Sequence, residues 1–584
     1  MRITSLRQGP ARIFLSFAAV AVFVSSSFSA TAQATYYYDY PGTINGKSKI
    51  ESLDDGLFGD EVSYIEGGIG FRVVDVVAST SVKLPLQFGR RMDPFADNLD
   101  SLNTQDREAD KKILILGPRW KPDIPSIVGV YPTRDGLYTG AKPRCSGGTL
   151  SPLAISIPSS PPVLPYNFWY GMTANIPGHG KEKIWPLTPG SVVPADNITY
   201  KFSTVSNWRV SCLPSLKNGP GEGYVIALPD GSRYFFDWLA LRNVSSFSTS
   251  LATEARKEMY FLATKAVDRY GNSVTYEYDP VNPTHLTRML ASDGAEIRLT
   301  YGANGKLAEV VSGGRTWRYS YATMGGREEL QYVTLPDSSK WQYTIPEYAY
   351  GNQLSNFGRN CDFRAYNLTS SGDSSVFKQT MVHPSGAVGE FVYKWIAHGY
   401  NNVHVGSCLE HQPLTTLVGR VKAYALMSLV SKTIKGPGLA DRTWSITYAP
   451  SWTYASECAN GCASTSQTIV TSGDGKVETY IFGNDFQRNP NQLLSHAVSK
   501  AGVVLRKSEY RYVASMEGQP FPDYIAGPTG EALSDTLDNP FFRRNRPRTE
   551  TAILQGGTLF KSTVNAFDTK ARPVNVTESS APLP

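Results

Sequence analysis

The chain lacks several features that mark catalytic, membrane-spanning or nucleic-acid-binding proteins. It contains no Gly-x-Ser-x-Gly nucleophile motif and no His-Glu-x-x-His metal motif. Charged residues make up only 18% of it, and the one long apolar stretch after Val24, Leu414–Val430, is interrupted by Arg420 and Lys422. A membrane-spanning helix needs about 20 consecutive apolar residues. The absence of a motif does not exclude an enzyme, in particular a glycosidase, whose two carboxylates carry no local signature.

The first 34 residues have the pattern of an export signal. A basic start with Arg2, Arg7 and Arg12 is followed by the apolar run Ile13–Val24 and by a small-x-small cleavage site at Ala32-Gln33-Ala34. The apolar run is short for a membrane span, so a signal anchor is the weaker interpretation. We expect a periplasmic, cell-surface or secreted protein. Removal of the three arginines lowers the net charge from +6 to +3, too mild a charge for nucleic-acid binding as the main role.

The remaining composition is typical of an extended β protein with many turns. Aromatic residues reach 12%, with 33 tyrosines, beside 51 glycines and 38 prolines. In the stretch 260–343, apolar and polar residues alternate with a period of two, as in Val274-Thr275-Tyr276-Glu277-Tyr278. Dipeptides such as Gly271-Asn272, Asp293-Gly294 and Asn304-Gly305 separate these runs and supply the positive φ angles of tight hairpin turns.

The strand-turn unit recurs along the chain. Tyr278, Tyr301, Tyr321 and Tyr343 follow one another at intervals of 23, 20 and 22 residues. A fixed period of this size predicts a repeated supersecondary unit whose neighbours cover each other's apolar faces. Further hairpins are predicted at 223–237, at 470–482, and at 492–512 with its turn at Ala501-Gly502.

These repeats resemble those of a known family. The segments DRYGNSVTYEYD, DGAEIRLTY and GRTWRYSY are similar to the tyrosine-aspartate (YD) repeats of the RHS (rearrangement hot spot) family. An upstream pattern resembles the entry segment of exported RHS-type proteins and comprises Gly59, Asp60, Val62, Gly67, Phe71, Asp75, Gly89 and Arg90. The resemblance implies an all-β fold in which antiparallel hairpin repeats form an extended or partly closed β-sheet shell, preceded by a smaller β-rich domain.

The expected domain organisation follows from these segments. We predict a signal peptide at 1–34, an amino-terminal β entry segment at 35–116 and a Pro/Gly-rich β domain at 117–258. The YD-like hairpin repeats occupy 259–517, and a linker with a final degenerate repeat occupies 518–584.

The resemblance implies a non-catalytic exported scaffold that encapsulates or presents a partner or a downstream domain at the cell surface. Family members commonly continue into an Asp-Pro-x-Gly self-cleavage motif and a carboxy-terminal toxic domain. Neither occurs in this sequence, so toxin activity does not carry over. The expected partner is a downstream repeat or toxin chain, or a second copy that pairs through an open sheet edge from Thr549 onward.

The alternative function is a secreted carbohydrate-binding or carbohydrate-hydrolysing protein, which would use aromatic side chains as platforms for sugars. Trp169, Trp185 and Trp208 are candidates for such platforms, but isolated tryptophans more often pack in a core. Asp54, Asp55, Asp60 and Glu61 could be imagined as an acid–base pair. Their turn context instead predicts a solvated edge.

Cysteines and histidines give the remaining candidate sites. Six cysteines in an exported chain indicate disulfides, with fifteen possible connectivities, and the close pair Cys458 and Cys462 is expected to bond. A redox-active pair is disfavoured because no nearby cation would lower a thiol pKa. The zinc-ligating residue types His398, His404, Cys408, Glu410 and His411 lack a compact two-plus-two spacing. We therefore predict no metal site, no cofactor and no catalytic residue.

Overall fold

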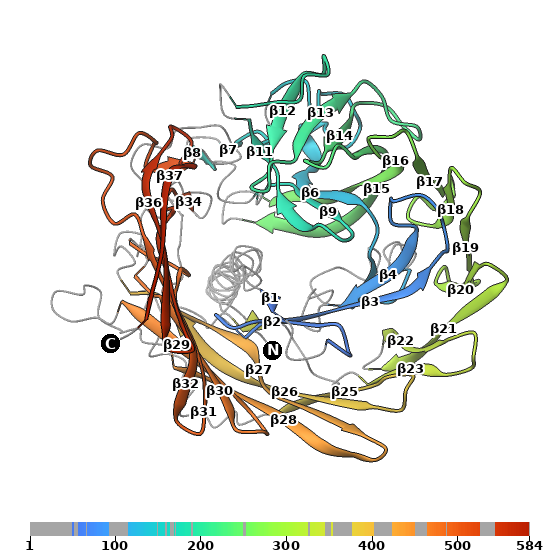
Figure 1. Ribbon diagram of the computed structural model, residues 1–584. Coiled ribbons are helices and arrows are strands. Elements are labelled where there is room, and N and C mark those ends of the chain that lie inside the picture. Colours follow the sequence, from blue (N-terminus) through green and yellow to red (C-terminus); the bar gives the residue numbers. More distant parts are fainter. Residues whose placement is uncertain are drawn as a thin grey trace, which may run out of the picture.

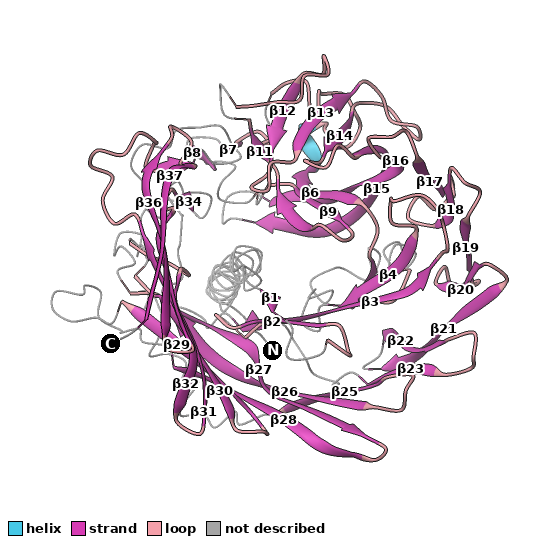
Figure 2. Cartoon of the chain, in the orientation of Figure 1, coloured by secondary structure: helices cyan, strands magenta, loops and turns pink. Residues whose placement is uncertain are grey.

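The computed structural model describes most of the chain from Ile50 onward. The described residues are 50–51, 56–65, 67–92, 115–148, 150–157, 160–163, 169, 171–187, 191–248, 253–324, 327–344, 352–353, 376–401, 423–449, 464–485, 488–525 and 543–582. Within these ranges the structure consists of strands and one 3-10 turn, η3 (Thr133–Asp135), as Figure 2 shows. All strands pair antiparallel, and two isolated bridges, Ile115–Gly117 and Asn401–Asp485, are parallel. No helix in the described part is both long and apolar enough to cross a bilayer. The predicted all-β fold class is confirmed.

The first element is a five-stranded antiparallel sheet, here called the N-terminal sheet. Its strands pair in chain order: β1 (Ile50–Glu51), β2 (Asp60–Ser63), β3 (Ile69–Val77), β4 (Gln87–Met92) and β5 (Trp120–Pro122). Alternate residues of β3 are buried, as the period-two pattern Ile69, Phe71, Val73 predicts.

A second, much longer ladder of strands forms a curved wall around this sheet (Figure 1). Its strands are β11 (Trp185–Pro186), β12 (Tyr200–Ser203), β13 (Arg209–Leu213), β14 (Gly223–Ala227), β15 (Arg233–Ser248), β16 (Thr253–Val267), β17 (Ser273–Tyr278), β18 (Leu286–Ala291), β19 (Glu296–Tyr301), β20 (Leu307–Ser312), β21 (Arg315–Met324), β22 (Arg327–Thr334), β23 (Lys340–Thr344), β24 (Asn352–Gln353), β25 (Phe377–Val382), β26 (Val388–Gly399), β27 (Ala423–Gly436), β28 (Leu439–Ala449), β29 (Thr465–Ser472), β30 (Lys476–Gly483), β31 (Leu493–Lys500), β32 (Val503–Tyr512), β35 (Arg548–Gln555), β36 (Thr558–Phe567) and β37 (Pro573–Pro582).

Almost every strand of the wall pairs with the next strand in the chain. The exceptions are β23, which pairs with β25, β24, which pairs with β27, and β32, which pairs with β35. Three further strands, β6 (Ser126–Pro132), β9 (Thr173–Ile176) and β10 (Gly180–Lys183), join through a β6–β16 ladder. Two small sheets pair β7 (Ile155–Ile157) with β8 (Ser160–Val163) and β33 (Tyr524–Ile525) with β34 (Arg543–Arg544). Pairing between sequence neighbours is the arrangement that hairpin repeats predict.

The repeated tyrosine ties three of the four hairpin units named above to the preceding strand, whereas the hydroxyl of the fourth, Tyr343, is buried and makes no such contact with the described residues. The hydroxyls of Tyr278, Tyr301 and Tyr321 donate to the main-chain carbonyls of Ala263, Leu286 and Leu307, each at 2.9 Å on the preceding strand. Tyr448 and Tyr512 repeat the contact with Leu429 and Leu493. The ring therefore packs in the sheet while the hydroxyl satisfies a backbone acceptor, which explains why tyrosine rather than phenylalanine recurs.

The aspartates of the repeats lie in the turns. The carboxylates of Asp268 and Asp568 accept the amides of Tyr270 and Lys570, two residues on, and both also accept an amide four residues on. The tight turns that follow use glycines with positive φ, such as Gly271 (φ 90°). The predicted hairpins at 223–237, 470–482 and 492–512 are confirmed as β14–β15, β29–β30 and β31–β32.

Candidate functional site

The N-terminal sheet lies against the inner face of the wall (Figure 1). Phe58 and Phe71 both meet Phe391 of β26 edge to face, with ring centroids 5.9 and 4.9 Å apart. Tyr64 stacks on Tyr480 of β30 at 4.6 Å. The wall thus holds a β element on its concave side, and we take this inner wall and its contacts as the candidate functional site.

A buried ion pair joins the N-terminal sheet to the wall. The Nζ of Lys432, in β27, donates to both carboxylate oxygens of Asp60, in β2, at 2.8 Å, and neither side chain is exposed to solvent. The prediction that Asp60 lies at a solvated edge was wrong. Burial on both faces of β2 turns this carboxylate toward the wall, and a buried carboxylate requires a cation beside it. Asp54 and Asp55 lie outside the described residues.

A second buried ion pair fixes the opposite part of the N-terminal sheet. Arg90 donates to Asp75 through Nε at 2.7 Å and Nη2 at 3.0 Å, and both side chains are fully buried. The wall contributes the hydroxyl of Tyr319, which donates to Asp75 at 2.9 Å, and the ring of Tyr343, 4.9 Å from the guanidinium. Burial by itself would lower the pKa of Arg90, but the charge and hydrogen bonds of Asp75 raise it above its ordinary value.

The turn between β2 and β3 fits the wall through a glycine. The carbonyl of Gly67 accepts the amide of Leu429 at 2.9 Å, and its φ is 73°. A Cβ at this position would collide with the side chain of Ser428 and lie 2.7 Å from the hydroxyl of Tyr448. Both the positive φ and the close approach therefore require glycine.

We predict that Gly67→Ala lowers the free energy of unfolding by more than Gly314→Ala. Gly314 has the same φ of 73°, but nothing lies within 4 Å of its missing Cβ. The control therefore isolates the backbone strain, about 1 kcal/mol, and the excess at Gly67 measures the steric overlap with the wall, about 1–3 kcal/mol. Chemical denaturation followed by tryptophan fluorescence measures both values. Equal losses would contradict the tight fit.

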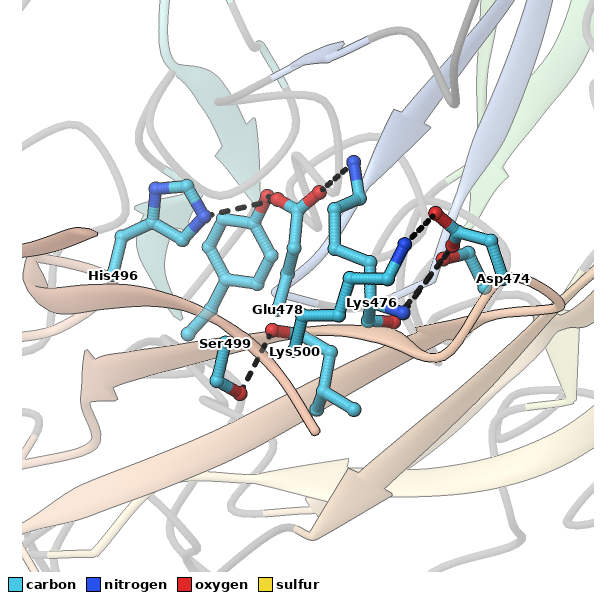
Figure 3. A network of polar contacts seen from close by, with 9 residues as sticks. Asp474, Lys476, Glu478, His496, Ser499 and Lys500 are labelled. Atoms are coloured by element: carbon cyan, nitrogen blue, oxygen red, sulfur yellow. Dashed lines mark hydrogen bonds and ion pairs between the residues drawn. The ribbon is translucent and has the colours of Figure 1, made fainter. Parts of the chain in front are cut away.

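A polar cluster on β30 and β31 supports the Tyr64 contact (Figure 3). Glu478 accepts hydrogen bonds from His496 at 3.0 Å and Tyr480 at 2.8 Å, and Lys476 lies 3.0 Å away. The His496 ring stacks on Tyr480 with ring centroids 4.3 Å apart, and Tyr64 stacks on the same tyrosine at 4.6 Å. The hydrogen bond from His496, against the opposing effect of burial, is the main cause that lowers the pKa of Glu478 to about 2.

The chemistry available to this cluster is limited. Its Glu–His pair would need a hydroxyl or thiol within hydrogen-bond reach of the imidazole to activate a nucleophile. Ser499, also drawn in Figure 3, instead donates to the carbonyl of Val477 at 3.3 Å. Asp474 and Lys500 form a neighbouring ion pair at 3.0 Å. The cluster therefore orients the aromatic stack that meets the N-terminal sheet.

A small half-open pocket lies beside the same contact. Its lining includes Ile65 from the turn between β2 and β3 and His398, Tyr448, Thr468 and Asn484 from the wall region. The space for a water-sized molecule is about 20 Å³, enough for one ordered water. The imidazole of His398 is buried and lies 3.0 Å from the hydroxyl of Ser428. Desolvation lowers the pKa of His398 to about 3.

We predict that His398 makes the protein less stable in acid. The unfolded chain binds a proton at His398 near pH 6.5, whereas the folded chain binds it only near pH 3. The contribution of neutral His398 to the free energy of unfolding is therefore fully present above pH 6.5. It is lost as the pH falls toward 3, by at most about 1.4 kcal/mol per pH unit. Unfolding midpoints of wild type and His398→Asn across this range test the effect. A slope that the substitution does not reduce would assign the acid sensitivity to other groups.

The remaining predicted residues are distributed as follows. Cys458 and Cys462, and also His404, Cys408, Glu410 and His411, lie outside the described residues. Trp169 and Trp208 are buried, as expected for core residues, and Trp185 is half-buried. The disulfide in the described part joins Cys145 to Cys212, a pairing that the sequence left among its fifteen possibilities.

The partners of the buried charges were also missed by sequence reasoning. Lys432 alternates with Val430 and Ile434 in a largely apolar strand, and a lysine at such a position is a usable signal of a buried charge. No local pattern, however, connects it to an aspartate 372 residues earlier. The described residues contain no group of histidine, cysteine, aspartate or glutamate side chains that could hold a metal ion.

Comparisons with known proteins give distant matches. No protein-family model matches the chain, and no curated protein matches it. Among solved structures, one match is the crystal structure of TcdB2-TccC3-Cdc42, with 9% sequence identity and a TM-score of 0.27. The aligned region covers 88% of this chain and 36% of the matched chain. The structure of TcdB2-TccC3 without its hypervariable C-terminal region matches with 9% sequence identity and a TM-score of 0.28, over 89% of this chain and 36% of the matched chain. The N-terminal domain of the effector protein SpvB from Salmonella typhimurium strain LT2 matches with 11% sequence identity and a TM-score of 0.18, over 64% of this chain and 98% of the matched chain. The chain thus spans about a third of the first two structures, and TM-scores this low do not show a shared fold.

Proposed function

We propose that this protein is a non-catalytic exported scaffold of the RHS type, whose curved β wall holds a polypeptide element on its inner face. The observation that carries the proposal is the N-terminal sheet itself. It lies on the concave side of the wall and is anchored there by Asp60–Lys432 and by Tyr319 bound to Asp75. A wall that already holds one β element in this way is suited to enclosing or presenting a partner or a downstream domain.

The energetics of the contact support a permanent scaffold rather than a mobile lid. Departure of the sheet would separate Asp60 from Lys432 and leave two buried charges uncompensated, which costs about 3–5 kcal/mol. The Arg90–Asp75 pair lies within the sheet, so there only the hydrogen bond from Tyr319 would be lost. The aromatic contacts of Phe58, Phe71 and Tyr64 with the wall add apolar burial. The N-terminal sheet is therefore expected to stay in place while the rest of the inner face remains available.

Export belongs to the proposal and rests on the sequence. Residues 1–34, with their basic start, apolar run and Ala32-Gln33-Ala34 site, lie outside the described part of the structure. The disulfide between Cys145 and Cys212 agrees with an oxidising compartment. Amino-terminal sequencing of the exported protein is expected to begin at Thr35.

The retention of the N-terminal sheet can be tested directly. A specific protease site inserted between β4 and β5, within 93–114, allows the chain to be cut after folding. We expect the fragment carrying β1–β4 to co-elute with the remainder on gel filtration without denaturant. In the Lys432→Ala variant we expect the β1–β4 fragment to dissociate more readily. The control Lys378→Ala removes an exposed ion pair with Glu390 at 2.8 Å, and there the fragment is expected to stay bound. Spontaneous separation of the wild-type fragments would contradict the proposal.

The carbohydrate alternative is addressed by a separate screen. In the described residues the tryptophans are buried or half-buried, so they do not form the open platforms that the alternative requires. We expect no turnover in a glycan hydrolysis screen and no retardation in sugar-affinity gels. Turnover that a single Asp or Glu substitution abolishes would replace the scaffold proposal with an enzymatic one.

A further inference from the structure

Two arginines lie directly opposite one another on the face of the N-terminal sheet that does not pack against the wall. Arg72 of β3 pairs in register with Arg91 of β4, and Lys121 of β5 pairs in register with Arg91. Successive residues of a strand point to opposite faces, so this row lies on the other side of the sheet from Phe71 and Arg90, which contact the wall. Like charges directly opposite one another destabilise a strand pair. The row therefore needs a compensating negative charge.

One carboxylate and one amide connect the two guanidinium groups. Nε of Arg72 donates to Asp123 at 2.6 Å, and Asp123 also accepts Nδ2 of Asn175, in β9, at 3.2 Å. Nη1 of Arg91 donates to the side-chain oxygen of the same asparagine at 2.5 Å. Figure 1 shows β3 and β4 beside β9 inside the ring of strands. Among the described residues the acceptor for Arg91 is thus neutral, and no carboxylate forms an ion pair with it.

Each arginine has one buried donor without a partner. Nη2 of Arg72 and Nε of Arg91 make no hydrogen bond within the described part of the chain. Burial is the main cause that lowers the pKa of Arg91, and the charge of Arg72 lowers it further, although the carboxylates of Asp123 and Glu61 act in the opposite direction. Both arginines are half-buried, with 32% of the Arg72 side chain exposed, so a group from outside can reach this surface.

The charges around the two arginines are predominantly positive. Lys121 adjoins Arg91, and Lys181 of β10 lies in register with the β9 asparagine. The carboxylates that act on Arg91 in the described structure are Asp123 and Glu61. The two arginines and the two lysines thus outnumber the carboxylates, and an added anion would reduce the repulsion between the cations.

We propose that Arg72 and Arg91 together bind one carboxylate of a polypeptide held inside the ring of strands. Each arginine offers one donor, Nη2 and Nε respectively, and a carboxylate has two oxygens that accept such charge-assisted hydrogen bonds. Directly opposite residues have Cβ atoms about 5 Å apart, so two long side chains can meet at one ligand. That the carboxylate belongs to a polypeptide rests on the proposed function, in which the wall encloses or presents a partner. The bound segment presents an Asp or Glu side chain, or its carboxy terminus, to this surface.

Fluorescence anisotropy with a labelled hexaglutamate peptide tests the site in the full mature chain. We expect saturable binding at low ionic strength, and about tenfold or more weaker binding in Arg72→Gln and in Arg91→Gln, because each loses a charge-assisted hydrogen bond. Arg91→Lys keeps the charge and should bind the peptide more tightly than Arg91→Gln. The matched control is Arg298→Gln, since Arg298 is 57% exposed and pairs with Glu296 on the wall. This control should bind as the wild type does.

Competition tests the chemistry of the ligand. Sodium acetate is expected to displace the labelled peptide at a lower concentration than sodium chloride of the same ionic strength, and a hexaglutamine peptide is expected not to displace it. Acetate and chloride that act equally would indicate general screening and overturn the carboxylate site. So would a hexaglutamate peptide that does not bind, or one that binds Arg91→Gln as tightly as the wild type.

Thermal unfolding separates ligand binding from a structural role. Arg91→Gln removes the like charge opposite Arg72, so we expect the unfolding midpoint of the ligand-free protein to stay unchanged or to rise. A lower midpoint with unchanged peptide affinity would assign Arg91 a structural role and overturn the site. If Arg91→Gln does not fold, the affinity of Arg72→Gln decides.

The two proposals fail in different ways. Loss of peptide binding, with a β1–β4 fragment that still co-elutes with the remainder, would reject the carboxylate site and leave the scaffold in place. Separation of the wild-type fragments, with peptide binding by the intact chain, would reject the scaffold and leave the carboxylate site in place.

Discussion

Replacing Lys432 by alanine is expected to lower the free energy of unfolding by about 3–5 kcal/mol. The substitution leaves the carboxylate of Asp60, which has no solvent exposure, without the ammonium that now contacts both of its oxygens. It also removes the contact of Lys432 with the Trp444 ring, 5.3 Å away. Chemical denaturation measures the loss, and proteolysis of the native protein should show earlier cleavage within β1–β4.

Two further variants distinguish the buried pair from ordinary surface electrostatics. Lys378→Ala breaks an ion pair of the same 2.8 Å length, but with Lys378 about half exposed it should cost less than about 1 kcal/mol. The double variant Asp60→Asn with Lys432→Met removes both charges and should recover much of the stability lost in Lys432→Ala. If the double variant is as unstable as the single one, the loss arises from packing rather than from the unpaired carboxylate.

The second large effect is expected at Arg90. Arg90→Met should cost about 3–5 kcal/mol, because Asp75 loses two hydrogen bonds while it remains fully buried. Arg90→Lys should recover only part of the loss, since an ammonium cannot form the two-pronged contact with Asp75 or lie flat over Trp120, now 4.4 Å from the guanidinium. Denaturation followed by tryptophan fluorescence reports both the stability and the environment of the rings.

Arg298 provides the matched control for Arg90. It donates to Glu296 at 2.8 Å, but its side chain is 57% exposed on the wall, so Arg298→Met should change the stability by less than about 1 kcal/mol. A full rescue by Arg90→Lys would show that charge alone matters at this position. Equal effects of Arg90→Met and Arg298→Met would contradict the importance assigned to burial.

The fold class was accessible from local patterns because hairpin repeats are built from sequence neighbours. Tyr276, Tyr301 and Tyr319 lie in β17, β19 and β21, as their alternation with polar residues predicts. The turn at Ala501-Gly502 was also located correctly, since φ values of 50° and 79° favour a small residue followed by glycine. In each case the residues that form the element lie within about a dozen positions of one another, so their spacing carries the signal.

The candidate site was less accessible because its contacts are long-range. The turn context of Asp60 predicts a solvated edge, yet Asp60 lies buried against Lys432. Asp75 and Arg90 belong to the sequence pattern that resembles an RHS-type entry segment. That pattern does not indicate that the two side chains bind one another and contact Tyr319 and Tyr343 of the wall. Nothing in the spacing of β2 and β27 specifies that they meet.

The sequence by itself determined that this protein is a succession of aromatic, antiparallel hairpins, because strand periodicity, turn dipeptides and the recurring tyrosine are local properties of the chain. Only the tertiary structure decided that the wall curves around the N-terminal sheet, that buried charges anchor this sheet, and that Cys145 bonds to Cys212. The physical reason is that desolvating a charge or closing a 67-residue separation depends on which distant segments approach one another.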